Sequence, residues 1–221
     1  MGYTVQMPTW LEIIPNWLWI CDNAIADESI SAVLDLMNNS SSAELDGDRE
    51  LHLVGSTRYN YHVKRDGIRK TAYMHEVLDS LDSLYLPVFG KAAPRAEMNP
   101  LQFFTKVFEP NKSFYDMHVE DPKFFGAAVF MLYLSNEHDG ELVVPSHVDS
   151  HQYITDGFVE MQSKLSIRYA DTTISILPER NRCVVMRVGM AHLVKHCSGS
   201  RPCITGWSFA SNEYYERFYN K

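Results

Sequence analysis

The sequence predicts a mainly β protein, a sandwich or barrel, with helices in an N-terminal extension. The chain has 221 residues, a length at which such β folds occur as one domain. From Leu101 onward, short β-rich runs alternate with turn residues, whereas the preceding part contains two stretches of helical periodicity. We therefore expect a helical or mixed extension over residues 1–100 that packs on a β core over residues 101–221, in one compact domain.

Two amphipathic helices are expected in the extension. The first follows Asp27, which stands where an N-cap residue should be. Its apolar residues recur at helical spacing: Ile30, Val33, Leu34 and Met37. The second is expected over Thr71–Leu86, with Pro87 as its stop. Between the two helices, Leu51–Lys64 shows short β-like alternation.

The β core is expected to contain six strands, each bounded by turn residues. They are Phe103–Phe108, Ala127–Leu134, Glu141–Val144, Thr172–Leu177, Cys183–Val188 and Cys203–Phe209. One of the turns is Pro178–Asn181. The least regular segment is Ser146–Ala170, and a long loop of this kind is the expected place for substrate contacts.

Charge and composition exclude several classes of protein. The formal net charge of -8 argues against a nucleic-acid partner, because such binding depends on Lys and Arg neutralising phosphates. No apolar run is long enough for a membrane span, and no basic segment precedes an apolar one as in a signal peptide. The four cysteines form no C-x-x-C pair. These features predict a reduced, cytoplasmic protein that does not bind membranes.

One tripeptide stands out among the nine histidines as a candidate metal motif. His118 and Glu120 are two residues apart, so on an extended chain they point to the same side. A second imidazole from a distant strand, either His192 or His196, would complete a two-histidine, one-carboxylate set of the kind that binds non-haem Fe(II). His147 and His151 are four apart, but Asp149 and Ser150 between them indicate a loop.

Five short motifs give this candidate a context. In chain order they are Val107-Phe108-Glu109-Pro110-Asn111, His118-Val119-Glu120-Asp121-Pro122, Leu132-Tyr133-Leu134-Ser135, Asp139-Gly140-Glu141-Leu142 and Arg201-Pro202-Cys203-Ile204-Thr205-Gly206-Trp207. Through them, residues 103–210 resemble the double-stranded β-helix (jelly-roll) core of the Fe(II)- and 2-oxoglutarate-dependent oxygenases, in particular the prolyl 4-hydroxylase-like group. The resemblance covers about half of the chain.

The resemblance implies a role for each matching residue. His118, Glu120 and His192 would hold the metal, and the family's nine-residue step from the distal histidine to Arg201 favours His192 over His196. Arg201 would bind the far carboxylate of 2-oxoglutarate. The other implied contacts are the hydroxyls of Tyr133 and Thr205, an apolar lining from Met131, Leu142 and Val194, and Tyr115 and Trp207 on the substrate side. One departure is Glu120, because most relatives have Asp there, and here Asp121 follows it.

The implied activity is a dioxygenase reaction. Fe(II), O2 and 2-oxoglutarate would hydroxylate a C–H bond, release succinate and CO2, and use ascorbate as a reductant. The implied substrate is a prolyl or other amino-acid side chain, in a free amino acid, a peptide or another small molecule. The alternatives are a cupin-like enzyme or binding protein, a nucleic-acid demethylase, and a non-catalytic jelly-roll protein. The oligomeric state is left open.

Overall fold

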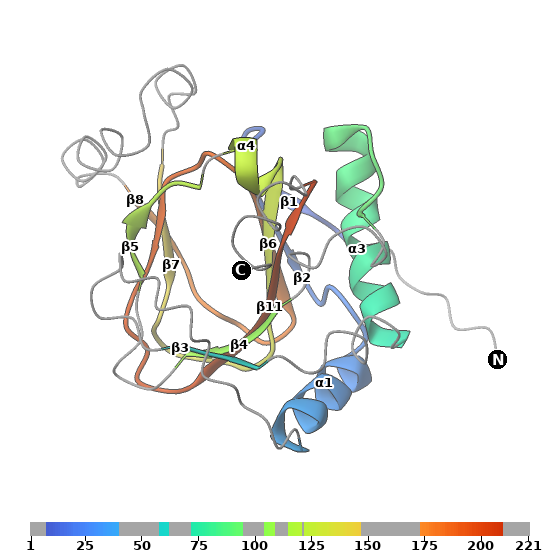
Figure 1. The fold of residues 1–221 in the computed structure, drawn as a ribbon, viewed down its shortest axis with the longest axis vertical. Coiled ribbons are helices and arrows are strands. Elements are labelled where there is room, and N and C mark those ends of the chain that lie inside the picture. The colour runs from blue at the N-terminus through green and yellow to red at the C-terminus, as the bar shows by residue number, and fades with distance from the viewer. Residues whose placement is uncertain are drawn as a thin grey trace, which may run out of the picture.

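Two antiparallel sheets make up most of the structure, a computed structural model that describes residues 8–39, 58–61, 72–94, 104–108, 115–120, 122–146 and 173–209 (Figure 1). The larger sheet has the strand order β1 (Leu11–Ile14), β2 (Leu18–Asp22), β9 (Arg182–Arg187), β6 (Ala128–Tyr133), β11 (Arg201–Ser208), β4 (Phe104–Phe108) and β3 (Arg58–Tyr61). The smaller sheet has the order β5 (Tyr115–His118), β10 (His192–Val194), β7 (Leu142–Pro145) and β8 (Thr173–Ile176).

The strands from β4 to β11 pair in a nested pattern. β7 pairs with β8, β6 with β9, β5 with β10 and β4 with β11, always antiparallel. Such nesting arises when a long antiparallel hairpin is folded over, so that its successive segments alternate between two facing sheets. This is a jelly-roll-like arrangement, and it confirms the prediction of a mainly β fold.

The strands β2, β9, β6 and β11 of the larger sheet divide their side chains between two hydrophobic clusters, as the period-2 alternation of a strand requires. On β6, Val129, Met131 and Tyr133 belong to the cluster between the sheets, together with Leu142 and Val194 of the smaller sheet. This inter-sheet cluster is the interior that the candidate site residues share.

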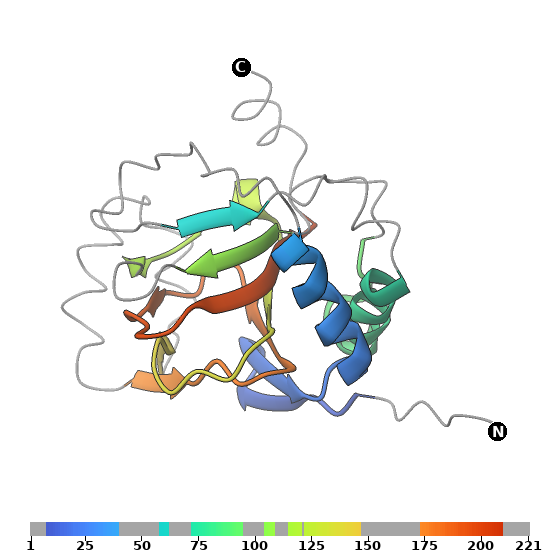
Figure 2. The ribbon, with the colours of Figure 1, turned by 90° about the horizontal axis from the view of Figure 1, so that it is seen from below.

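The second cluster lies between the larger sheet and two helices, α1 (Asp27–Asn39) and α3 (Ala72–Phe89). Phe130 and Leu132 of β6 face the helices there, where they meet Val33 of α1 and Leu81 of α3. Both views place α1 and α3 on the side of the larger sheet away from the smaller one (Figure 2). The helices therefore cover the outer face of the sheet and leave its inner face to the site.

Both predicted helices are confirmed, but two of the predicted boundary features are wrong. Asp27 is the first helical residue and not the N-cap, because the amides of Ser29 and Ile30 donate to the carbonyl of Ala26. A side chain from α3 supports this end instead, since the Ala26 amide donates to Glu76 Oε2 at 3.2 Å.

The predicted stop of the second helix is also wrong. Pro87 lies inside α3, which continues to Phe89. A proline in the last turn removes only one amide donor, so the helix can continue past it to Phe89. The helix ends at Gly90, where φ is +68° and the amide donates to the carbonyl of Leu86.

The strands β1 and β2 were not predicted from the Trp-rich opening. Pro15 and Asn16 interrupt the apolar residues between Trp10 and Ile20. They form the turn of a hairpin in which Asn16 has a φ of +62°. β2 then pairs with β9, so this segment extends the larger sheet. The predicted domain boundary near residue 100 lies outside the described residues and stays a prediction.

The turn at Pro178–Asn181 is confirmed, and it anchors the N-terminal part of the chain. Asn181 has a φ of +65° and is buried. Its side-chain amide donates to the carbonyl of Ile25 at 2.7 Å and accepts from the amide of Ile25 at 3.1 Å. All four cysteines are buried free thiols. None of the described helices combines the length and the apolar character of a membrane span.

Candidate active site

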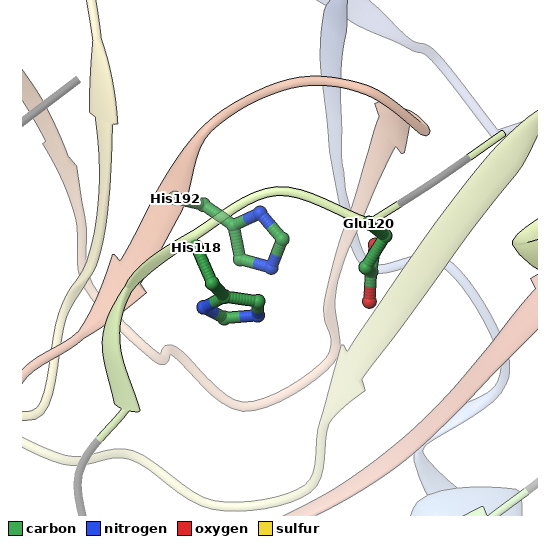
Figure 3. A group of neighbouring side chains, drawn as sticks. All are labelled: His118, Glu120 and His192. Atoms are coloured by element: carbon green, nitrogen blue, oxygen red, sulfur yellow. The ribbon is translucent and has the colours of Figure 1, made fainter. Parts of the chain in front are cut away.

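Two neighbouring strands of the smaller sheet bring two histidines together. His118 ends β5 and His192 begins β10, and the two residues are directly paired in the antiparallel register. Their ring centroids lie 4.2 Å apart, with 55° between the ring planes. Two histidines that are 74 positions apart in the sequence thus lie with their imidazole rings side by side (Figure 3).

Glu120 completes a group that could hold a metal ion. One potential ligand atom from each of His118, Glu120 and His192 lies within 4.8 Å of the others. The carboxylate comes from the stretch that leaves β5, and Figure 3 shows it beside the two rings. Glu120 and His192 are 8% and 6% exposed, so the carboxylate and one imidazole are already withdrawn from solvent.

Hydrogen bonding fixes the tautomer of His192. Its Nδ1 lies 3.0 Å from the carbonyl of Met190. A carbonyl can only accept, so Nδ1 carries the proton and Nε2 of the neutral ring keeps its lone pair. Metal-binding histidines have such a partner on the other ring nitrogen, because it orients the ring and raises its basicity. His192 could therefore bind a metal through Nε2.

Trp207 contacts the carboxylate of this group directly. Its indole Nε1–H donates to Glu120 Oε1 at 2.7 Å, a short distance typical of a hydrogen bond to an ionised acceptor. The ring of Phe125, from α4 (Pro122–Phe125), lies 5.2 Å from the Trp207 ring at an angle of 46°. The sequence predicted Trp207 on the substrate side but gave no sign of its bond to Glu120.

Arg201 is the largest fully buried side chain among the described residues, at 1% exposure. It begins β11, and its guanidinium carbon lies 5.6 Å from the ring centroid of Tyr133 on β6. Its Nη1 donates to the carbonyl of Gly140 at 2.8 Å. This anchor holds a planar, permanently charged donor group inside the sandwich, where it could bind a carboxylate through two parallel hydrogen bonds.

The hydroxyls of Tyr133 and Thr205 lie in the same interior. Tyr133 is completely buried, and among the described residues its hydroxyl has no hydrogen-bond partner. Burial raises the pKa of Tyr133 to about 12, so its phenol stays protonated and can donate. Thr205 is buried and donates to the carbonyl of Phe130 at 2.9 Å, which leaves its oxygen able to accept. An unsatisfied buried hydroxyl is unusual and fits a ligand that brings an acceptor.

The remaining predicted site residues either lie in the inter-sheet cluster, are exposed, or fall outside the described part of the chain. Met131, Leu142 and Val194 all belong to the inter-sheet cluster, as their predicted lining role requires. His196 is exposed, and the group that could hold a metal contains His192 instead. Tyr115 lies on β5 opposite Val194, but its side chain is outside the described part, as are Asp121, His147, His151 and the segment 147–170.

Gly140 is a contributor whose role the sequence did not reveal. Its φ is +76°, and an added Cβ would lie 2.7 Å from the Cβ of Cys197. Its carbonyl is the acceptor for Arg201. The signal available in the sequence was a glycine between two predicted strands, which indicates a positive φ but not the long-range partner.

Replacing Gly140 by alanine is expected to lower the free energy of unfolding by about 1–3 kcal/mol, because the collision with Cys197 adds to the strain of a positive φ. Gly90→Ala is a matched control, since Gly90 has a φ of +68° with nothing within 4 Å of an added Cβ. Urea unfolding of both variants should show the larger loss for Gly140→Ala. Equal losses would mean that the turn relaxes away from Cys197.

The fold is similar to those of three solved structures. A prolyl-4-hydroxylase from Pseudomonas putida has 15% identity, with 88% of this chain and 92% of that chain covered and a TM-score of 0.57. A prolyl hydroxylase from Trichoplax adhaerens, in complex with a hypoxia inducible factor oxygen degradation domain peptide fragment, has 14% identity, 90% and 86% coverage and a TM-score of 0.57. HygX from Streptomyces hygroscopicus, with nickel and 2-oxoglutarate bound, has 10% identity, 88% and 83% coverage and a TM-score of 0.60.

Comparison at the level of sequence gives no such similarity. No protein-family model and no curated protein matches the chain. The likeness is therefore one of structure, and it extends over most of the described elements of both sheets. The chain has the prolyl hydroxylase-like fold of the 2-oxoglutarate oxygenases.

Proposed function

We propose that this protein is an Fe(II)- and 2-oxoglutarate-dependent dioxygenase that hydroxylates a C–H bond, and that β4–β11 form its double-stranded β-helix. The observation that carries the proposal is the group of His118, Glu120 and His192, which lies in the same fold as the buried Arg201 and Tyr133. The three potential metal ligands alone, or the buried Arg201 and Tyr133 alone, could be structural. Together they match the two functions that the reaction requires, which are binding of the metal and binding of 2-oxoglutarate.

The metal would be held by His118, Glu120 and His192. Two neutral imidazoles and one carboxylate suit a divalent first-row metal, and three protein ligands leave positions open for other groups. The bond from His192 Nδ1 to Met190 supports the neutral tautomer that binding needs. When bound, iron with 2-oxoglutarate and O2 supplies the oxidising power for hydroxylation, and the cosubstrate leaves as succinate and CO2.

The cosubstrate would be held by Arg201, Tyr133 and Thr205. Arg201 and Thr205 are four residues apart on β11, so they lie on the same face of the strand. Tyr133 is on the adjacent strand, opposite Cys203. A carboxylate placed between the guanidinium and the Tyr133 hydroxyl would give that hydroxyl its acceptor.

The apolar side chains around these groups would keep water out. Met131, Leu142 and Val194 are buried in the inter-sheet cluster. Hydrogen bonds and ion pairs are stronger where water is excluded, so this lining would strengthen the contact between Arg201 and a carboxylate. The protein's contribution is thus to orient the metal ligands and the cosubstrate in a dry interior.

For the substrate we propose a prolyl or other amino-acid side chain, in a peptide or a free amino acid. Two of the structural neighbours are called prolyl hydroxylases, and one of these binds a peptide fragment. Tyr115 on β5 would face this substrate.

Anaerobic titration tests the proposal. Purified protein is mixed with Fe(II) and 2-oxoglutarate, separately and together, while the visible spectrum is recorded. A weak charge-transfer band that requires both additions is the expected result, followed by succinate release when O2 and ascorbate are added. Binding of Fe(II) with no effect of 2-oxoglutarate would indicate a cupin-like metal protein instead. If folded protein binds no Fe(II), the protein is a non-catalytic jelly-roll protein and the proposal is wrong.

A further inference from the structure

Glutamate has one more rotatable bond than aspartate, so a glutamate that binds a metal needs more support to keep one orientation. Glu120, placed two positions after His118, would be such a residue in the proposed metal site. Its Oε1 accepts a 2.7 Å hydrogen bond from the indole of Trp207. Glu120 as a residue is 8% exposed, so water competes little with this bond. One of its two oxygens is thereby oriented by a rigid, aromatic donor.

Trp207 is itself held from two directions. On β11 it pairs with Val129 of β6 in the centre of the larger sheet. Its ring packs on Phe125, and the helix that carries Phe125 begins two residues after Glu120. The chain from Glu120 to Phe125 therefore returns to the indole that binds Glu120. This closed arrangement ties the carboxylate to the central strands of the sheet.

We propose that Trp207 is a positioning residue for the metal site: its indole N–H fixes Oε1 of Glu120 so that Oε2 is directed at the space beside the two histidines. This inference rests on the proposed function. It explains how glutamate can stand where an aspartate is expected, because the tryptophan restrains the additional methylene. The hydrogen bond also withdraws charge from the carboxylate, so it should alter the ligand field as well as the affinity.

Co(II) is a suitable probe, because its visible bands report coordination and its binding needs neither O2 nor substrate. We would titrate the wild-type protein and the variants Trp207→Phe, Glu120→Asp and the double variant with Co(II) alone. Trp207→Phe keeps a ring to pack on Phe125 but loses the donor. Loss of a hydrogen bond to a metal ligand lowers metal affinity about 10-fold to 100-fold, and we expect a loss of this size together with a change in the visible bands.

The double variant separates hydrogen bonding from packing. The shorter Asp at position 120 cannot reach both the indole and the metal, so Trp207→Phe should change the Co(II) affinity less than about twofold in that background. Trp10→Phe is the matched control. The Trp10 indole, also half-buried, donates to Ser83 Oγ at 2.9 Å, on the far side of the larger sheet, and its loss should leave Co(II) binding unchanged.

Several outcomes would overturn the inference. One is wild-type affinity and spectrum in Trp207→Phe, and another is the same loss of affinity with Asp as with Glu at position 120. If Trp207→Phe does not fold, the indole ¹H–¹⁵N signals provide a second measurement. The Trp207 signal should move on Glu120→Asp while the Trp10 signal does not, and an unmoved Trp207 signal refutes the inference. If the wild type fails to bind Co(II), it is the proposed function that fails.

Discussion

Replacing His192 by alanine is expected to abolish the proposed metal-dependent turnover. The substitution removes one of three side chains whose ligand atoms lie within 4.8 Å of one another. The two groups that remain, His118 and Glu120, are only two residues apart and are held by one strand and the stretch that leaves it. Binding of Fe(II) by two ligands should be at least about 100-fold weaker than by three, because a full ligand bond is lost and not only an outer hydrogen bond.

The measurement is the anaerobic spectrum with Fe(II) and 2-oxoglutarate, followed by succinate release in air. His192→Ala should show neither the charge-transfer band nor succinate release above background. His196→Ala is the matched control, because it removes an imidazole only four residues away that is exposed. It should behave as the wild type. If His196→Ala loses the band and His192→Ala keeps it, the assignment of the second histidine is wrong.

The histidine pair shows how far the sequence could lead. His118 and Glu120 were recognisable because the alternation of a strand is a local property. The choice between His192 and His196 could not be made from the local sequence. It depended on the spacing to Arg201, which the resemblance to the oxygenase family supplied. The structure adds a physical reason, since the register of β10 on β5 places His192 opposite His118. A register between strands 74 residues apart depends on the packing of both sheets and cannot be read from either segment.

The features that the sequence did not reveal are long-range polar contacts. Trp207 and Glu120 are 87 residues apart, and Arg201 and Gly140 are 61 apart. The cap that Glu76 provides for Ala26 crosses 50 residues. In each case the residue type was consistent with several roles, and only the tertiary structure selected one. Hydrophobic periodicity predicted most of the core strands and both larger helices, because burial repeats along each element whereas a single hydrogen bond does not.

The second prediction with a large effect concerns Arg201. Arg201→Ala is expected to weaken 2-oxoglutarate binding by about 100-fold or more, because two charge-assisted hydrogen bonds to the far carboxylate would be lost. The affinity of Arg201→Lys for 2-oxoglutarate should lie between those of the wild type and the alanine variant. An ammonium keeps the charge but cannot hold the Gly140 carbonyl and a carboxylate with the same planar geometry. Binding is measured by titrating 2-oxoglutarate into protein saturated with Co(II).

A second arginine of the larger sheet provides the control for Arg201. Arg182 on β9 forms ion pairs with Asp22 at 2.7 Å and Glu179 at 2.9 Å, and both acids are about half exposed. Arg182→Ala removes a largely buried arginine, its two ion pairs and its bond to the carbonyl of Leu177, so it should lower the free energy of unfolding by about 1–3 kcal/mol and leave the affinity for 2-oxoglutarate unaltered. A loss of affinity in both arginine variants would indicate general damage to the sheet.

The ligand can be varied as well as the protein. 2-Oxopentanoate has the carbon chain and the keto acid of 2-oxoglutarate but lacks the far carboxylate. If Arg201 binds that carboxylate, the wild type should strongly prefer 2-oxoglutarate, and Arg201→Ala should bind both compounds with the same low affinity. A preference that survives in Arg201→Ala would place the carboxylate elsewhere. In that case the hydrogen bond from the buried guanidinium to the Gly140 carbonyl would support the turn, and the burial of Arg201 at 1% exposure would be a structural feature of the sheet.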